Sequence, residues 1–162
     1  MYRFSGFLEM MSQSEKDIYA FDETLFPRNN TQWIFVNVKE IAGASIWDEL
    51  CLFYAIQPLA TKCSPQPMNP IVSDVRYARS FGRLFVESGE LYRPSQNCFH
   101  RYRYGLNVNR ILKLTPMNYQ VQPIRSYGPN WDPSIRGLRT FNQADGLTLI
   151  DAIRRNKRRK FR

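Results

Sequence analysis

The sequence predicts an α+β fold: a small, mostly antiparallel β core with two or three short helices and a basic C-terminal helical extension. The 162-residue chain is 43% hydrophobic and 14% aromatic, which is enough apolar material for one folded core. Strand-forming residues are dense in the middle of the chain, and segments near both ends show helical spacing of apolar residues. Because β-branched and aromatic residues recur from Gln32 to Val121, an all-β sandwich or jelly roll is the alternative.

The composition divides the chain into three parts. These are an acidic N-terminal segment with a short helix (1–30), a single globular core (31–144) and a basic C-terminal helix or tail (145–162). In the first part, residues 14–26 are expected to form a helix, because apolar residues recur there every three or four positions and Pro27 ends the pattern.

The core begins with the strongest strand signal of the chain, at residues 32–41, which are rich in β-branched and aromatic residues. Residues 46–56 predict a short buried helix, since apolar residues from Trp47 to Tyr54 recur at spacings of three and four. The competing interpretation is a helical turn that leads into a strand at 52–59, because β-formers are dense there.

Four prolines make residues 58–70 a loop that separates the acidic front of the chain from its basic rear. The spacing of apolar residues and arginines in residues 75–86 fits either a helix or a strand. The glycine within this segment, together with the turn expected at Ser88–Gly89, favours strands and a hairpin.

The segment 98–127 is expected to be strand. Its even-numbered residues from His100 to Val108 are aromatic or aliphatic, so Arg101 and Arg103 would face away from the core, where guanidinium groups can engage phosphate. Residues 127–134 predict an ordered loop. A helix is then expected from Asp145, because apolar residues recur at spacings of three before the basic tail.

Charge is graded along the chain. Residues 1–50 carry a net charge of −4, residues 51–100 carry +2, and residues 101–150 carry +5. The last twelve residues add +6, which completes the formal +9. A basic rear of this kind predicts a polyanionic partner.

The function predicted from this pattern is that of a non-enzymatic, RNA-binding structural subunit of a large ribonucleoprotein, most simply a ribosomal or mitochondrial ribosomal protein. Its partners would be rRNA, bound through the C-terminal half, and neighbouring subunits. A viral coat or nucleocapsid protein is the alternative, and a scaffold on another acidic surface is a third possibility. The nucleic-acid-binding residues would be Arg101, Arg103, Lys113, Arg125, Arg136, Arg139, Arg154, Arg155, Lys157, Arg158, Arg159, Lys160 and Arg162.

No catalytic residues and no cofactor are predicted, because the chain has one histidine, no phosphate-binding glycine loop and no nucleophile elbow. A metal site would need Cys51, Cys63, Cys98 and His100 to converge, although their spacing is unlike that of zinc sites. The odd cysteine count suggests a reducing compartment, such as the cytoplasm or mitochondrion. No apolar run is long enough to span a membrane, and no signal or transit peptide is recognisable.

Overall fold

The computed structural model describes residues 19–39, 45, 47–56, 63–144 and 146–155. Within these ranges the chain is all β, with eleven strands and no helix. The predicted α+β class is therefore wrong, and the all-β alternative fits. The strands are β1 (Tyr19–Arg28), β2 (Thr31–Lys39), β3 (Glu49–Ile56), β4 (Ser64–Pro65), β5 (Val72–Ser73), β6 (Phe85–Glu87), β7 (Glu90–Asn97), β8 (Gly105–Thr115), β9 (Asn118–Tyr127), β10 (Ile135–Ala144) and β11 (Leu147–Arg154).

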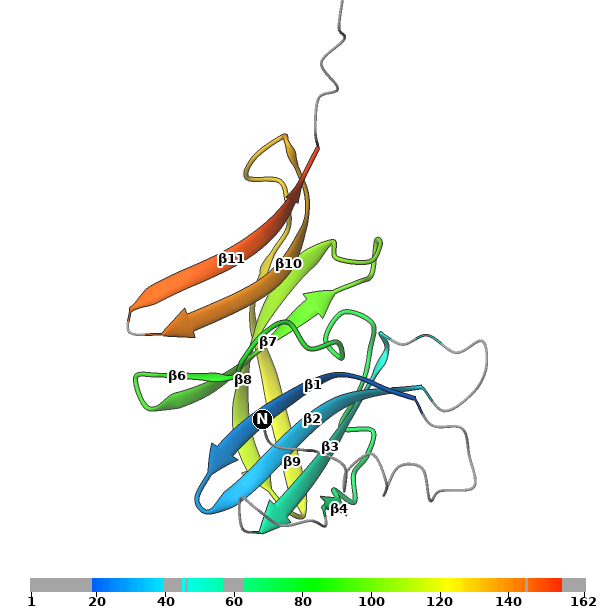
Figure 1. Cartoon of the computed structure of the whole chain (residues 1–162), viewed down its shortest axis with the longest axis vertical. Coiled ribbons are helices and arrows are strands. Elements are labelled where there is room, and N and C mark those ends of the chain that lie inside the picture. Colours follow the sequence, from blue (N-terminus) through cyan, green and yellow to red (C-terminus); the bar gives the residue numbers. More distant parts are fainter. Residues whose placement is uncertain (1–18, 40–44, 46, 57–62, 145, 156–162) are drawn as a thin grey trace, which may run out of the picture.

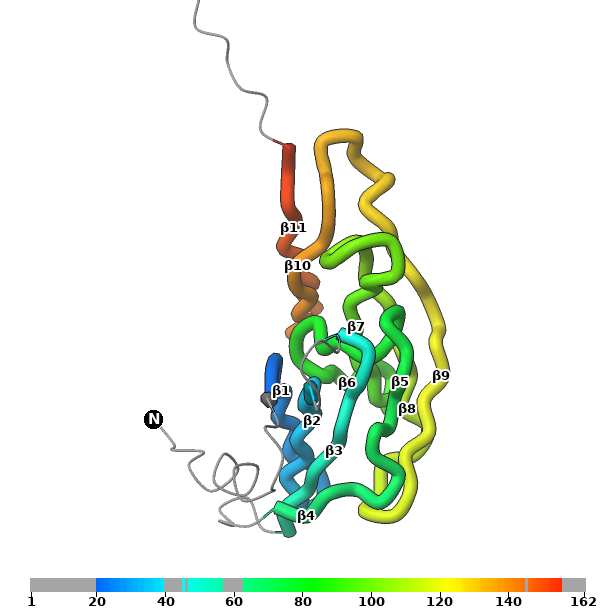
Figure 2. Tube along the Cα trace, turned by 90° about the vertical axis from the view of Figure 1, so that its right-hand side faces the viewer, coloured from blue at the N-terminus to red at the C-terminus, as the bar shows by residue number. Residues whose placement is uncertain are grey.

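These strands form three antiparallel sheets. The first has the order β1-β2-β3-β4, with β5 also paired to β3, and the second has the order β6-β7-β8-β9. The third is the two-stranded hairpin β10-β11. In Figure 2 the hairpin lies in the same layer as β1 and β2, with β8 and β9 in the layer opposite.

The first hairpin replaces the helix predicted at 14–26. Its described part, from Tyr19, is strand β1, which pairs with β2 across a two-residue turn at Asn29 and Asn30. Both asparagines have positive φ, at 50° and 55°, as the type I′ turn of a tight hairpin requires. Residues 14–18 lie outside the described part.

The strand predicted at 32–41 is confirmed as β2, whose side chains alternate between two apolar clusters. Trp33 and Phe35 enter one cluster, while Ile34 and Val36 enter the other. The helix predicted at 46–56 is wrong, because residues from Glu49 onward form β3, which pairs with β2 along its length. The competing interpretation is right about a strand, which begins at Glu49 and not at residue 52, but the described residues before it form a bend and no helical turn. The predicted end of that strand, at 57–59, lies outside the described residues.

The second sheet confirms the hairpin predicted at Ser88–Gly89, where Glu87 pairs with Glu90 and both turn residues have positive φ. The strand expected from residue 98 begins only at Gly105, because residues 99–103 form a turn. The prediction that Arg101 and Arg103 lie on the opposite face of a strand from the aromatic residues is therefore wrong. Both arginines instead lie over tyrosine rings, Arg101 over Tyr104 and Arg103 over Tyr102.

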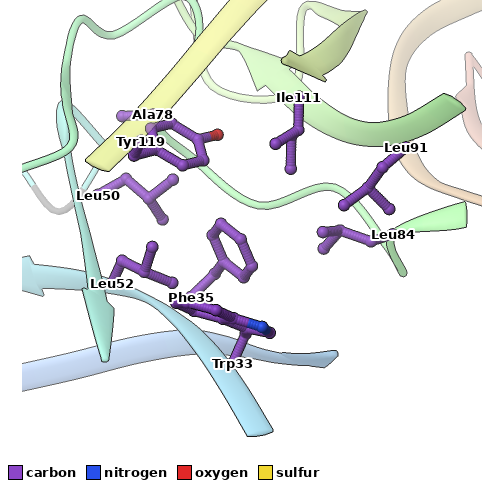
Figure 3. Close-up of a cluster of buried hydrophobic side chains, with 9 residues drawn as sticks. All are labelled: Trp33, Phe35, Leu50, Leu52, Ala78, Leu84, Leu91, Ile111 and Tyr119. Carbon is purple, nitrogen blue, oxygen red and sulfur yellow. The ribbon is translucent and has the colours of Figure 1, made fainter. Parts of the chain in front are cut away.

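The main core fills the space between the first two sheets (Figure 3). One sheet contributes Trp33, Phe35, Leu50 and Leu52. The facing sheet contributes Leu91, Ile111 and Tyr119, and the connecting segment adds Ala78 and Leu84. Burial of this apolar surface is the main force that holds the two sheets together.

The helix predicted from Asp145 is also wrong, because residues 147–154 form β11, which pairs with β10. This hairpin is attached to the rest of the molecule through a third cluster, in which Leu138 and Phe141 pack against Phe81 and Leu106. The amide of Phe141 also donates to the carbonyl of Phe81 at 3.0 Å. As Figure 1 shows, the hairpin lies beside β6–β8 and above β1–β3.

Candidate functional site

A groove of about 760 Å³ lies between the β6–β9 sheet and the β10-β11 hairpin. Its volume is within the range of small-molecule sites. The sheet supplies one wall, with Tyr92 from β7 and residues 124–127 from β9. The hairpin supplies the opposite wall, with Phe141 and Ile150 among its residues. The loop after β9 adds Asn130 and Trp131.

Three aromatic rings form a continuous surface in this groove. Phe85 stacks on Tyr92 with centroids 5.2 Å apart and planes 18° apart. Phe85 also contacts Phe141 of the hairpin, with centroids 5.5 Å apart. These contacts hold the rings in fixed positions, so the groove presents a preformed aromatic surface.

The polar groups of the groove are few. Glu87 from β6 accepts a hydrogen bond from the side-chain amide of Gln143 of β10, at 3.4 Å. Arg125 is exposed on β9, and its guanidinium donates to the hydroxyl of Tyr127 at 3.4 Å. This contact raises the pKa of Arg125 further, so the cation persists at any working pH.

The loop after β9 is held in place by Asp132. Its carboxylate accepts hydrogen bonds from the amide and the hydroxyl of Ser134, both at 2.7 Å. These bonds, helped by Arg154 at 3.6 Å, hold the pKa of Asp132 below its ordinary value. The loop is therefore ordered by local bonds, while Trp131 is left 64% exposed.

A groove of this kind suits a ring that carries hydroxyl groups and one anionic group. The aromatic faces can cover the C–H face of such a ring, and Glu87 and Gln143 can bond its hydroxyls. Arg125 supplies a charge-assisted donor for a phosphate oxygen. Among the lining residues Glu87 is the one carboxylate, so the groove does not contain the carboxylate pair used in glycoside hydrolysis.

A second crevice, of about 730 Å³, lies between β1 and β10. Its charged lining residues are Asp22, Glu23, Arg83 and Arg139. The charges of these four residues sum to zero. The aromatic residues that line the crevice are Phe26 and Phe81. It therefore lacks the stacked rings that distinguish the groove.

The predicted phosphate-binding residues fall at four separate places. Arg101, Arg136, Arg154 and Arg155 lie at one end of the molecule, and Arg103 lies in the same turn as Arg101. Arg125 lies in the groove, and Arg139 lies at the second crevice, 3.8 Å from Asp151. Lys113 is on β8, remote from these arginines along the strand. Lys157, Arg158, Arg159, Lys160 and Arg162 are outside the described residues.

The cysteines and the histidine do not form a metal site in the described part of the chain, where no group of three potential ligands is placed to hold a metal ion. Burial raises the pKa of Cys63 and of Cys98, which keeps both thiols protonated. No helix among the described residues is long and apolar enough to cross a membrane.

The sequence analysis missed the aromatic groove residues Phe85, Tyr92, Trp131 and Phe141, and also the polar residues Glu87 and Gln143. They are spread over four segments, and each is ordinary for a strand or loop when read alone. The ordered loop predicted at 127–134 was the available signal, because it holds two aromatic residues among turn formers.

Comparison with known proteins identifies a family. Residues 15–136 match the family described as glucosamine inositolphosphorylceramide transferase 1, N-terminal. A protein of that name from Oryza sativa subsp. japonica is 32% identical over 105 residues, which is 64% of this chain and 14% of the relative. The Arabidopsis thaliana protein of the same name is 31% identical over 101 residues, 61% of this chain and 13% of the relative. The aligned part of the chain thus spans about one-seventh of the length of these relatives.

One solved structure, described as the crystal structure of a GH43_1 enzyme from Xanthomonas citri, aligns with a TM-score of 0.42 and 15% identity. The alignment covers 67% of this chain and 34% of that one. A likeness at this level assigns neither fold nor function.

The family match overturns the predicted function. The predicted rRNA-binding ribosomal or mitochondrial subunit and its viral coat alternative are wrong, and so is the prediction of a non-enzyme, because the matched family is named for a transferase. The error arose because a basic chain terminus fits any anionic partner and does not identify that partner as RNA. The match covers three-quarters of the chain, which belongs to the glucosamine inositolphosphorylceramide transferase 1 N-terminal family.

Proposed function

We propose that this chain serves as the acceptor-binding part of a glucosamine inositolphosphorylceramide transferase, and that the groove holds the inositol phosphate head group of the lipid. Support comes from the family match and from the chemistry of the groove. Inositol is a ring with C–H faces and hydroxyl edges, and its phosphodiester is an anion.

The observation that carries this proposal is the combination of stacked rings with one exposed cation, Arg125, in a groove of suitable size. Phe85 and Tyr92 line the groove with apolar carbon, against which the C–H face of a cyclic polyol can pack. Arg125 is exposed beside them, so its guanidinium is available to a phosphate oxygen. Glu87 and Gln143 can then bond the hydroxyl edge of the ring.

In this proposal the groove positions the acceptor and does not itself make the new glycosidic bond. The residues that line the groove include one carboxylate and no histidine. That is too little to remove the proton of the acceptor hydroxyl and also to protonate the leaving group. The relatives are about seven times longer than their aligned segment, so they have room for a separate catalytic region.

The test is a calorimetric titration of the 162-residue chain with soluble inositol 1-phosphate, which needs no membrane. Saturable binding is expected, and Arg125→Gln should weaken it by about tenfold or more, because a charge-assisted hydrogen bond is lost. Arg28→Gln is the matched control, since Arg28 is also exposed but is the last residue of β1, beside the turn of the first hairpin. Absence of saturable binding, or equal losses in the two variants, would refute the proposal.

A further inference from the structure

One end of the molecule brings together three segments that are distant in the sequence. They are the turn at 98–104, the segment 128–136, which comprises the loop after β9 and the start of β10, and residues 154–155 at the end of β11. We call this region the aromatic–basic end. The amide of Arg155 donates to the carbonyl of Ser134 at 2.7 Å, and the amide of Leu138 donates to the carbonyl of Arg103 at 2.9 Å. Figure 1 shows the loop before β10 and the end of β11 side by side at the top of the molecule.

Two large aromatic side chains are exposed at the aromatic–basic end. Phe99 and Trp131 are each 64% exposed, although both belong to segments that are held by hydrogen bonds. Trp131 is in the loop fixed by Asp132, and the amide of Phe99 donates to the side chain of Asn97 at 3.0 Å. The rings are therefore presented to solvent by ordered backbone, and two exposed rings at one end of the molecule mark it as a candidate contact surface.

The same end is strongly basic. Its described residues include five arginines and one carboxylate, that of Asp132. Four of the five arginines are exposed, and Arg103 is half-buried. The guanidinium groups of Arg101 and Arg103 lie 5.2 and 4.6 Å from the tyrosine rings that they cover, so the turn presents cations and aromatic rings together. In the sequence, residues 156–162 add five further cations immediately after Arg155.

We propose that the aromatic–basic end is a membrane-contact surface, which rests on the anionic head groups of a lipid bilayer. Aromatic side chains favour the boundary between water and lipid, where Phe99 and Trp131 would lose their exposure. Arginines beside them are attracted to the negative surface potential of anionic lipid. Nucleic-acid bases could also stack on exposed rings beside arginines. A lipid surface is favoured because the family that matches this chain is named for transfer to a phosphorylated ceramide.

This inference goes beyond the head-group site and takes from the proposed function only the lipid nature of the substrate. Trp131 lines the groove and also belongs to the aromatic–basic end. A bilayer that contacts this end would therefore bring lipid head groups to the mouth of the groove. The two proposals remain separable, because the membrane contact needs anionic lipid of any kind and the groove needs the inositol phosphate.

The test is sedimentation of the full chain with vesicles of phosphatidylcholine that contain about one quarter phosphatidylserine and no inositol lipid. Wild-type protein should sediment with these vesicles, and much less with phosphatidylcholine alone or at high salt. Phe99→Ala should lower the partition coefficient by about fivefold, because its buried apolar area is lost. Arg136→Gln should lower it by a similar factor, about fivefold per cation.

Matched controls lie at the other end of the second sheet. Met117 is 70% exposed in the β8-β9 turn, and the ten residues of β9 separate it from the aromatic–basic end by roughly 30 Å. Met117→Ala and Lys113→Gln should therefore leave vesicle binding unchanged. The inference is overturned if wild-type chain does not bind these vesicles, or if the control variants lose as much binding as the test variants. Failure here together with intact inositol 1-phosphate binding would reject the membrane contact and leave the head-group site standing.

Discussion

Gly82 lies directly against the carbonyl oxygen of Phe141, so closely that a Cβ atom on Gly82 would overlap with it. Gly82 also has a φ of +114°, which residues with side chains rarely adopt. The neighbouring amide of Phe141 donates to the carbonyl of Phe81 at 3.0 Å. This close backbone contact attaches the β10-β11 hairpin to the molecule and so sets the width of the groove.

The first prediction concerns this contact. Gly82→Ala should lower the free energy of unfolding by about 3 kcal/mol, because it combines backbone strain with a steric clash. It should also weaken inositol 1-phosphate binding, since Phe141 would be displaced from the groove. Gly89→Ala is the control: Gly89 also has a positive φ, at +81°, but open space surrounds it. That variant should cost only about 1 kcal/mol in urea denaturation. Equal losses in the two variants would show that the contact with Phe141 does not matter.

The second prediction concerns Arg93, which is 1% exposed between the two main sheets. Its guanidinium donates to the carbonyl of Tyr77 at 2.5 Å and to that of Ala78 at 3.3 Å. Arg93→Lys should lower the free energy of unfolding by about 2–3 kcal/mol, because one ammonium group cannot reproduce the forked contact with both carbonyls.

Arg28→Lys, at an exposed position, serves as the control and should change stability by less than about 0.5 kcal/mol. Urea denaturation measures both variants. A negligible effect of Arg93→Lys would mean that these two hydrogen bonds contribute little to the fold.

The third prediction follows from the lowered pKa of Asp132. Because its pKa is lower in the folded state, Asp132 stabilises the loop at pH values above the ordinary carboxyl range, and this stabilisation is lost as the pH falls through the folded-state pKa. NMR titration of the side-chain carboxyl should give a midpoint below 3.8, the ordinary value.

Ser134→Ala removes the hydroxyl that donates to Asp132 and should raise this midpoint toward the ordinary value. Ser126→Ala, on β9, should leave the titration midpoint of Asp132 unchanged. If Asp132 titrates normally in the wild-type chain, the loop that carries Trp131 is not held in the way described.

The strand β2 could be predicted because it is rich in β-branched and aromatic residues, which in the structure fill a buried cluster on each of its faces. The same reasoning failed for β3, where Trp47, Leu50 and Tyr54 happen to fall at helical spacing. In the structure Leu50 and Leu52 face one cluster and Cys51 the other, and pairing with β2 imposes that alternation. Local spacing cannot reveal a partner that is distant in sequence.

The error at β11 has the same origin. Leu147, Ile150 and Ile153 are spaced by three, as on a helix, but Ile150 pairs with Phe141 of β10. The groove could not be predicted at all, because Phe85, Tyr92 and Phe141 meet only after three strands have paired and the hairpin has docked. Arg125 was selected from the sequence on charge alone, and only the structure places it beside aromatic rings.

The most direct test of the central claim is a ¹⁵N–¹H NMR titration of the chain with inositol 1-phosphate. Saturable shifts are predicted for the amides of Glu87, Tyr92 and residues 125–127, and Arg125→Gln should weaken them together. Shifts confined to the second crevice, around Arg83 and Arg139, or no saturable shift at any residue, would contradict a head-group site in the groove.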